Sequence, residues 1–143
     1  MISESDMRRE VVKLIESDGG HASSVESHAT SAGIPDLDFC WDGLEGHIEL
    51  KFWTVKNNKG LRPSQVRWFR DRIKAGGKPC LLVKTMANIF ILVPGNRYRD
   101  LQGKVSSLMQ AEMERNSKHR WTQFPTAVEL KDALNDLIKG SQN

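Results

Sequence analysis

Two acidic residues and a lysine lie close together in the sequence, on either side of a short turn. Asp36 follows Pro35, and Glu49 and Lys51 come shortly after the turn. Two carboxylates suit a hard divalent cation such as Mg²⁺, which usually keeps several waters and binds the phosphate of a substrate. A lysine beside them can hold the attacking water or stabilise charge on phosphorus. This combination predicts cleavage of a phosphodiester bond.

The spacing Glu-x-Lys carries little information by itself. With each residue type at roughly 6% of positions, about half of all chains of this length contain it by chance. Glu129-Leu130-Lys131 is a second copy in this chain. There, Thr126 and Glu129 have the spacing of a capping box at the start of a helix. We therefore interpret Glu129 as a helix cap and Lys131 as a solvated helix residue.

The first copy is predicted to lie on a β-hairpin. Apolar and polar residues alternate over 37–41 and again over 47–52, which is the period of half-buried strands, and turn residues separate the two runs. Strands joined by so tight a turn pair antiparallel, so the start of the first approaches the end of the second. Glu49 and Lys51 share one face of their strand, and that face can meet Asp36. The alternative is a hairpin with a polar outer face and no catalytic role.

Length and composition favour a single intracellular domain. The chain has 143 residues, enough for one compact domain with a real core. We expect this single domain to span residues 1–143, with its core over about 1–95 and a C-terminal helical extension over about 96–143. No apolar run approaches the length of a membrane span, and the N-terminus does not resemble a signal peptide. Cys40 and Cys80 are expected to be reduced core residues. No cysteine or histidine spacing predicts a structural zinc site.

Positive charge is concentrated in the middle of the chain. The net charge is +3, yet residues 51–84 contain ten Lys and Arg and one acid, Asp71. Clustering of this kind is expected where a protein contacts phosphate backbones, although a solvated helix face is the alternative. The residues that we select for contacts with the DNA backbone are Lys56, Lys59, Arg62 and Arg67.

The hydrophobic periodicity predicts an α/β domain with a mixed central sheet flanked by helices, plus C-terminal helices. The expected elements are a helix from Ser3 to Gly19, strands at 22–26, 37–41, 47–52, 80–83 and 88–93, a helix over 63–76, and helices after 104. Residues 28–32 and 57–60 are expected to form loops, the second of them mobile and basic. Trp53 could stack on an unpaired base or pack within its loop.

The ordered set of motifs resembles the PD-(D/E)xK nuclease superfamily, and most closely its VRR-NUC branch. The resemblance covers a little over half of the chain and is carried by Glu4 with Met7, Val11, Val12 and Ile15, by Gly33-Ile34-Pro35-Asp36, by Ile48-Glu49-Leu50-Lys51, by Gly60-Leu61-Arg62-Pro63-Ser64-Gln65 with Trp68-Phe69, and by Ala75-Gly76-Gly77 with Leu81-Leu82-Val83. It implies a restriction-endonuclease-like core and a metal-dependent DNA endonuclease. Residues 81–84 lack the valine and arginines that name the branch.

The resemblance also implies roles for individual residues. Asp36 and Glu49 would bind Mg²⁺ or Mn²⁺, with the Leu50 carbonyl as a further ligand. Lys51 would orient the nucleophilic water or stabilise the transition state. Small stand-alone members of the branch are similar to Holliday-junction resolvases, tend to be homodimers, and occur in phages and bacteria. Junction or branched DNA, a homodimer, and the cytoplasm of a bacterial or phage-infected cell are therefore expected.

Two further polar residues match the family at the flanking helices. Glu4 matches the helix glutamate and would be a metal ligand, with Glu10 as a rival beside the apolar stripe. A favourable charge near a helix N-terminus is the alternative for Glu4. Gln65 matches a glutamine on the helix after the hairpin and would belong to the catalytic set. The competing functions are a non-catalytic nucleic-acid-binding module, with structural acids, and an interaction protein in which both features are incidental.

Overall fold

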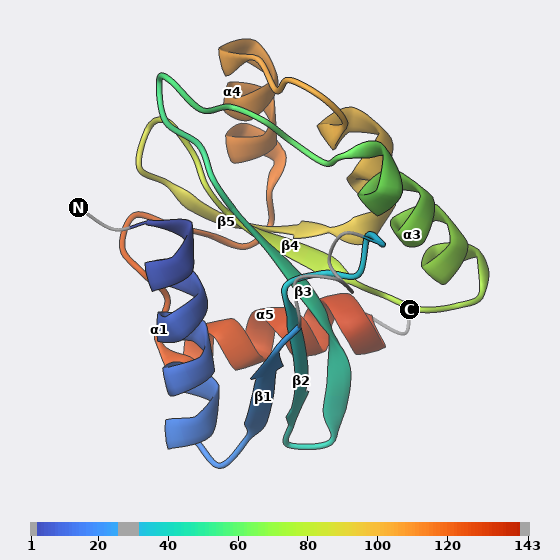
Figure 1. The fold of residues 1–143 in the computed structure, drawn as a ribbon. Coiled ribbons are helices and arrows are strands. Elements are labelled where there is room, and N and C mark those ends of the chain that lie inside the picture. The colour runs from blue at the N-terminus through green and yellow to red at the C-terminus, as the bar shows by residue number, and fades with distance from the viewer. Residues whose placement is uncertain (1–2, 26–31, 141–143) are drawn as a thin grey trace.

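The computed structural model describes residues 3–25 and 32–140. A six-stranded sheet with the order β1-β2-β3-β4-β5-β6 forms its centre (Figure 1). The strands are β1 His21–Ser24, β2 Leu37–Trp41, β3 Leu44–Phe52, β4 Cys80–Lys84, β5 Phe90–Pro94 and β6 Arg120–Trp121. β3 and β4 pair parallel and the other neighbours pair antiparallel. The predicted α/β class with a mixed sheet flanked by helices is confirmed.

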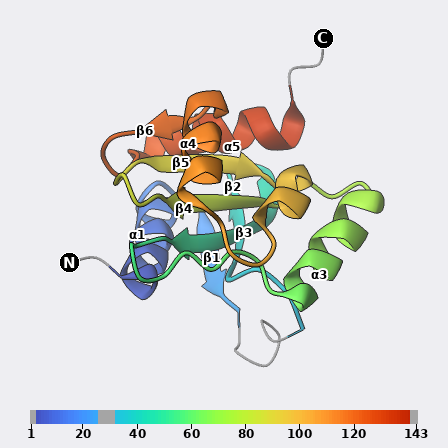
Figure 2. The same ribbon diagram turned by 90° about the horizontal axis from the view of Figure 1, so that it is seen from above.

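Helices cover both faces of the sheet, as the two views together show (Figures 1 and 2). The helices are α1 Glu4–Ser17, α3 Pro63–Lys74, the 3₁₀ helix η1 Gly95–Leu101, α4 Ser107–Asn116 and α5 Ala127–Lys139. α1 and α5 share one hydrophobic core with Ile48 and Leu50 of β3. α3, η1 and α4 share the other with Leu81 and Val83 of β4. The central strands are therefore buried on both faces, which fits the nearly continuous apolar runs of β4 and β5.

Reciprocal helix caps are present at α1 and at α5, the second of them predicted from the sequence. Ser3 and Asp6 form a reciprocal capping box at the start of α1, where each side chain accepts a hydrogen bond from the backbone of the other. Thr126 and Glu129 do the same at the start of α5. The interpretation of Glu129 as a helix cap is confirmed.

Several element boundaries differ from the prediction. β1 ends at Ser24, and the expected strand end at residue 26 and most of the predicted loop 28–32 lie outside the described residues. β5 starts at Phe90 because Asn88 adopts a φ of 62° in a turn closed by its N–H bond to the Thr85 carbonyl. The segment after residue 104 was predicted to be helical, but it also supplies β6, which pairs with β5.

Two side chains were assigned to the wrong environment. Cys40 is exposed, because the apolar residues of β2 occupy its inward positions and Cys40 lies between them on the outer face. Cys80 is buried as predicted, and burial raises the pKa of its thiol to about 12. Lys131 is not simply solvated: its ammonium lies 2.9 Å from Asp18 Oδ2 and 3.5 Å from Asp42 Oδ2, which joins α5 to the end of α1 and the hairpin turn.

Trp53, at the start of the loop after β3, is buried, whereas Val55, Lys56 and Asn57 of the same loop are exposed. Trp53 is 1% exposed, and its indole N–H donates a hydrogen bond to the Lys59 carbonyl at 2.9 Å. Packing within the loop is thus confirmed for Trp53, and the alternative that Trp53 stacks on an unpaired base was wrong.

Among the helices of residues 3–25 and 32–140, the structure contains none with the length and apolar character needed to cross a bilayer.

Candidate active site

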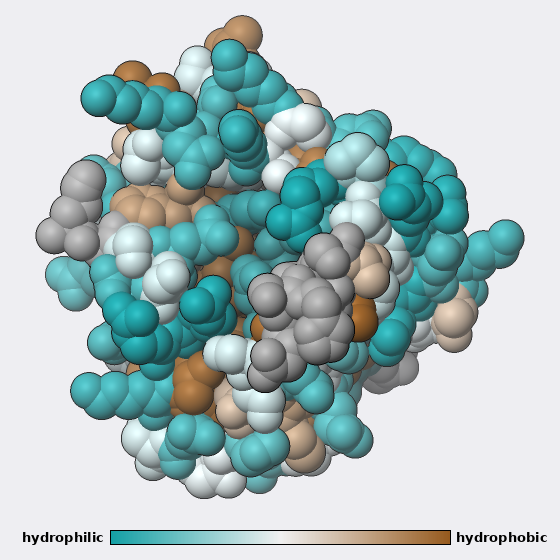
Figure 3. Space-filling model, viewed as in Figure 1, coloured by the Kyte–Doolittle hydropathy of each residue, from teal (hydrophilic) through white to brown (hydrophobic). Residues whose placement is uncertain are grey.

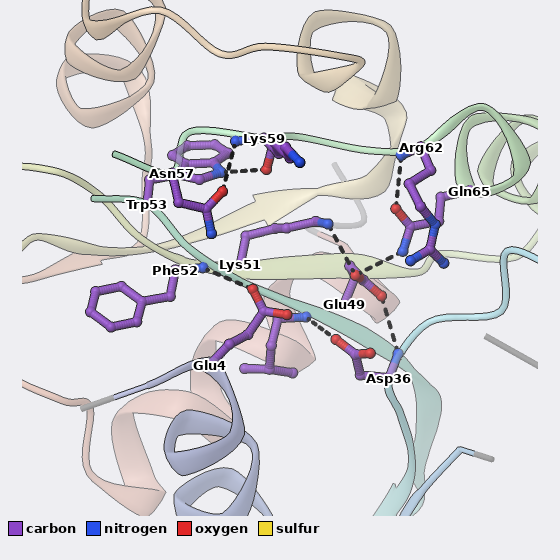
Figure 4. Close-up of polar contacts among 11 residues, drawn as sticks. Glu4, Asp36, Glu49, Lys51, Phe52, Trp53, Asn57, Lys59, Arg62 and Gln65 are labelled. Carbon is purple, nitrogen blue, oxygen red and sulfur yellow. Dashed lines mark hydrogen bonds and ion pairs between the residues drawn. The ribbon is translucent and has the colours of Figure 1, made fainter. Parts of the chain in front are cut away.

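The predicted site lies where β3 extends past the first residue of β2. The first residue of β2 pairs with Ile48, so among the described residues the rest of β3 has no strand partner on that edge. The N–H groups that point to this edge bind carboxylates instead. Leu50 N–H donates to Asp36 Oδ2 at 3.2 Å, and Phe52 N–H donates to Glu4 Oε2 at 3.4 Å (Figure 4). Hydrogen bonding at an open strand edge therefore holds two acidic side chains from different elements side by side.

Glu49 lies at the centre of the cluster, on the face of β3 that α3 covers, and it is 2% exposed. Its Oε1 accepts a hydrogen bond from the Asp36 N–H at 3.1 Å, and its Oε2 accepts one from the Gln65 amide at 2.9 Å. Lys51 Nζ is 3.5 Å from the same Oε2. The structure thus brings together all four residues predicted to form the catalytic set (Figure 4).

The start of α3 positions Gln65. Its Oε1 accepts a hydrogen bond from the Arg62 N–H at 2.9 Å, so its amide nitrogen points to Glu49. Gly33 lies directly against this turn, since a Cβ on Gly33 would come within 2.1 Å of the Ser64 carbonyl oxygen. Gly33 also has a φ of +98°, which favours glycine. The segment that carries Asp36 and the helix that carries Gln65 are therefore in backbone contact.

Of the two candidate glutamates on α1, Glu4 reaches the cluster. Partial burial raises the pKa of Glu4, the positive charge of Lys51 opposes this, and the charge of Asp36 adds to it. Glu10 is exposed and lines a different surface pocket with Arg9 and Phe124. Because Ser3 and Asp6 already cap α1, a contact with the edge of β3 describes the position of Glu4 better than a charge at a helix end.

Burial dominates the electrostatics of Glu49. It raises the pKa of Glu49 to about 7, and the neighbouring charge of Asp36 adds to the rise. Lys51, the Asp36 N–H and the Gln65 amide oppose it but do not cancel it. Near neutral pH the cluster therefore takes up either a proton or another positive charge.

This gives a first prediction, for the metal-free protein. The pKa of Glu49 is raised from 4.5 to about 7 in the folded state, so the folded state binds more protons than the unfolded chain between these values. The contribution of Glu49 to the free energy of unfolding should fall as pH rises from 5 to 8, by on the order of 2 kcal/mol. Urea denaturation in EDTA across this range measures the slope. Glu49→Gln should flatten it, and an unchanged slope in that variant would contradict the assignment.

The donor set fits a cation that is shared with water and substrate. Within the described ranges, no three His, Cys, Asp or Glu side chains form a group that could hold a metal ion by themselves. Asp36 and Glu49 supply hard oxygen donors, and the Leu50 carbonyl should point to the same strand edge as its N–H. An incomplete oxygen set of this kind fits Mg²⁺, which keeps waters and binds phosphate.

The basic residues selected from the sequence lie on the surface, and they follow Glu49 and Lys51 closely in the sequence. Lys56 and Lys59 belong to the loop after β3, Arg62 precedes α3 and Arg67 lies on it, and all four are exposed. Hydrophilic side chains predominate on the face of the molecule that includes α3 and the loop before it (Figure 3).

Comparisons with protein-family models and with curated proteins found no match. Among solved structures, the chain is similar to Hjc from Archaeoglobus fulgidus, a Holliday junction resolvase from an archaeal hyperthermophile. The two share 14% sequence identity with a TM-score of 0.46, over 65% of this chain and 73% of the other.

Proposed function

We propose that this protein is a metal-dependent DNA endonuclease that hydrolyses phosphodiester bonds. The observation that carries the proposal is the hydrogen-bonded group of Asp36, Glu49, Lys51 and Gln65 at the open edge of β3. The segment before β2 and strand β3 place two carboxylates and an ammonium at one point, and α3 adds the amide of Gln65. The exposed basic residues that follow in the chain support a polyanionic substrate.

In this proposal Asp36 and Glu49 hold Mg²⁺ or Mn²⁺. The Leu50 carbonyl is a further ligand, and Glu4 binds the ion directly or through water. When bound, the ion lowers the pKa of its water and neutralises charge that develops on phosphorus. Gln65 is a positioning residue, because it holds one oxygen of Glu49 in place from the start of α3.

Lys51 is the residue that meets the reacting phosphate. Its side chain is 11% exposed and its ammonium lies beside Glu49, so it can donate a hydrogen bond to the attacking water or to a non-bridging phosphate oxygen. The water oxygen gives up a proton to solvent as it forms a bond to phosphorus, the opposite bridging P–O bond breaks, and the released oxygen takes a proton from solvent. Backbone contacts position the duplex without reading its sequence, so DNA shape should decide which substrate is cut.

We further propose that the protein belongs to the VRR-NUC branch of the PD-(D/E)xK superfamily, acts as a homodimer, and prefers junction or branched DNA in a bacterial or phage-infected cell. The quoted motifs support this assignment because the structure brings their polar residues together. Sedimentation in the presence and absence of DNA measures the oligomeric state.

The decisive experiment incubates supercoiled, linear and four-way-junction DNA with the protein in Mg²⁺, in Mn²⁺ and in EDTA. Cutting that requires the metal is expected, with the junction cut fastest. Salt-sensitive binding without cutting in any metal would instead identify a non-catalytic nucleic-acid-binding module. Neither cutting nor binding would leave the basic cluster and the acids as incidental features of an interaction protein.

A further inference from the structure

A short backbone pairing joins the loop before α3 to the segment after η1. Gly60 N–H donates to the Gly103 carbonyl at 2.5 Å, and Val105 N–H donates to the Asn58 carbonyl at 2.9 Å. These two bonds flank an isolated antiparallel bridge between Lys59 and Lys104. The pairing sets Lys59, which belongs to the basic segment 51–84, against Lys104 in the C-terminal part of the chain.

The pattern of these bonds fixes how the two lysines face each other. Neither Lys59 nor Lys104 takes part in the flanking bonds, so they form a non-hydrogen-bonded pair, the arrangement in which antiparallel side chains lie closest. Both side chains are exposed. Like charges directly opposite one another on paired strands repel and are destabilising.

No carboxylate relieves this repulsion in the part of the chain that the structure describes, where neither ammonium forms a salt bridge. The approach is also close. A Cβ on Gly60 would lie 1.9 Å from the Leu101 carbonyl oxygen, and Gly103 adopts a φ of +69°. Two glycines therefore allow a close backbone approach that sets Lys59 opposite Lys104, and among the described residues neither lysine has an acidic partner.

The lysine pair lies on the same side of the sheet as the candidate active site. Leu61, two residues after Lys59, packs in the hydrophobic core between the sheet and the helices α3 and α4. The chain then runs through Arg62 into the turn of α3 that holds Gln65 against Glu49. Figure 4 shows Lys59 and Lys51 on the same side of β3.

We propose that Lys59 and Lys104 together bind one backbone phosphate of the DNA, beside the phosphate that is cut. This inference rests on the proposed function, and it adds a substrate contact from the C-terminal part of the chain. The two non-bridging oxygens of a phosphate can accept hydrogen bonds from both ammoniums, so the anion removes the repulsion between them. The pair is preorganised because the backbone bridge holds the two stems in place before DNA arrives.

DNA binding in EDTA tests the pair without any need for cleavage. The affinity of a fluorescent four-way junction and of a matched duplex is measured against salt for the wild type, Lys59→Ala, Lys104→Ala, the double variant and the control Lys13→Ala. Each single variant should weaken binding to both DNAs, and the double variant should reduce the slope of log affinity against log salt by about 1, the value for one phosphate. Lys13, which is exposed on α1, should have no effect.

The double variant tests whether the two lysines share one phosphate. Its loss of affinity should differ from the sum of the two single losses, because residues that bind the same group are coupled. Losses that simply add would overturn the shared site, and unchanged binding by Lys104→Ala would overturn any role for this residue. Because wild-type cleavage is scored separately, a failure of the lysine pair and a failure of the nuclease proposal give different results.

Charge reversal separates DNA binding from folding. Lys104→Glu places an acid opposite Lys59, so its Tm should equal or exceed that of the wild type while its DNA affinity falls below that of Lys104→Ala. Inorganic phosphate is used as a second probe. If Lys104→Ala loses binding of free phosphate and retains full DNA affinity, the site is one for a small anion, and the DNA contact is overturned.

Discussion

Lys51→Ala is expected to lower metal-dependent cleavage of DNA by at least about a hundredfold while DNA binding in EDTA stays close to wild type. Lys51 Nζ lies 3.5 Å from Glu49 Oε2, and the proposed step needs a donor that meets charge at the reacting phosphate. The exposed basic residues that would bind the DNA backbone are untouched by this change. Single-turnover cleavage of the preferred substrate and a binding titration in EDTA measure the two quantities separately.

The chain offers matched controls for this result. Asp36→Asn should abolish cleavage by a second route, which covers the case that Lys51→Ala unfolds when it leaves two carboxylates without their ammonium. Glu129→Ala alters the other copy of the tripeptide and should cost only a little stability, since Glu129 caps α5. Wild-type cleavage rates in folded Lys51→Ala or Asp36→Asn would contradict the site assignment, as would lost cleavage in folded Glu129→Ala.

Gly33→Ala is expected to destabilise the protein by on the order of 3 kcal/mol and to slow cleavage even where the protein remains folded. The new methyl group would lie 2.1 Å from the Ser64 carbonyl oxygen, and both partners are backbone. Relief of this clash must move the start of α3, and with it the Gln65 amide that holds Glu49. Urea denaturation gives the stability, and cleavage well below the Tm gives the effect on the site.

Gly76→Ala separates the clash from the backbone strain. Gly76 has a φ of +100°, almost the same as the +98° of Gly33, but a Cβ there would meet nothing within 4 Å. It should therefore cost only the left-handed strain, about 1–2 kcal/mol, and leave cleavage unchanged. Equal losses of stability in the two variants would mean that the contact between Gly33 and α3 contributes nothing.

Local periodicity was enough to predict most of the site. The alternation of β2 and β3 placed Asp36 opposite Glu49 with Lys51 on the same face, and the structure joins Asp36 and Glu49 by a hydrogen bond. The role of Gln65 followed instead from the resemblance to the nuclease superfamily, and the proline at the start of α3 only located the helix that carries it. These residues interact through neighbouring elements, whose signals are present in short stretches of sequence.

Contacts between distant parts of the chain could not be predicted in this way. Nothing near Glu4 indicates that its carboxylate accepts a hydrogen bond from the Phe52 N–H, because the contact depends on where β2 begins relative to β3. The bridge between Lys59 and Lys104 depends equally on the path of the chain through η1. β6 was missed because a strand of two residues is too short to show a period.

The open edge of β3 has a consequence for solubility. An unpaired strand edge is a template on which a strand from another molecule can add, and proteins commonly block such edges with charge. Here the carboxylates of Asp36 and Glu4 already occupy the N–H groups that an incoming strand would need. The side chains proposed to bind the metal thus also protect the protein from edge-to-edge aggregation, so their removal would affect more than catalysis.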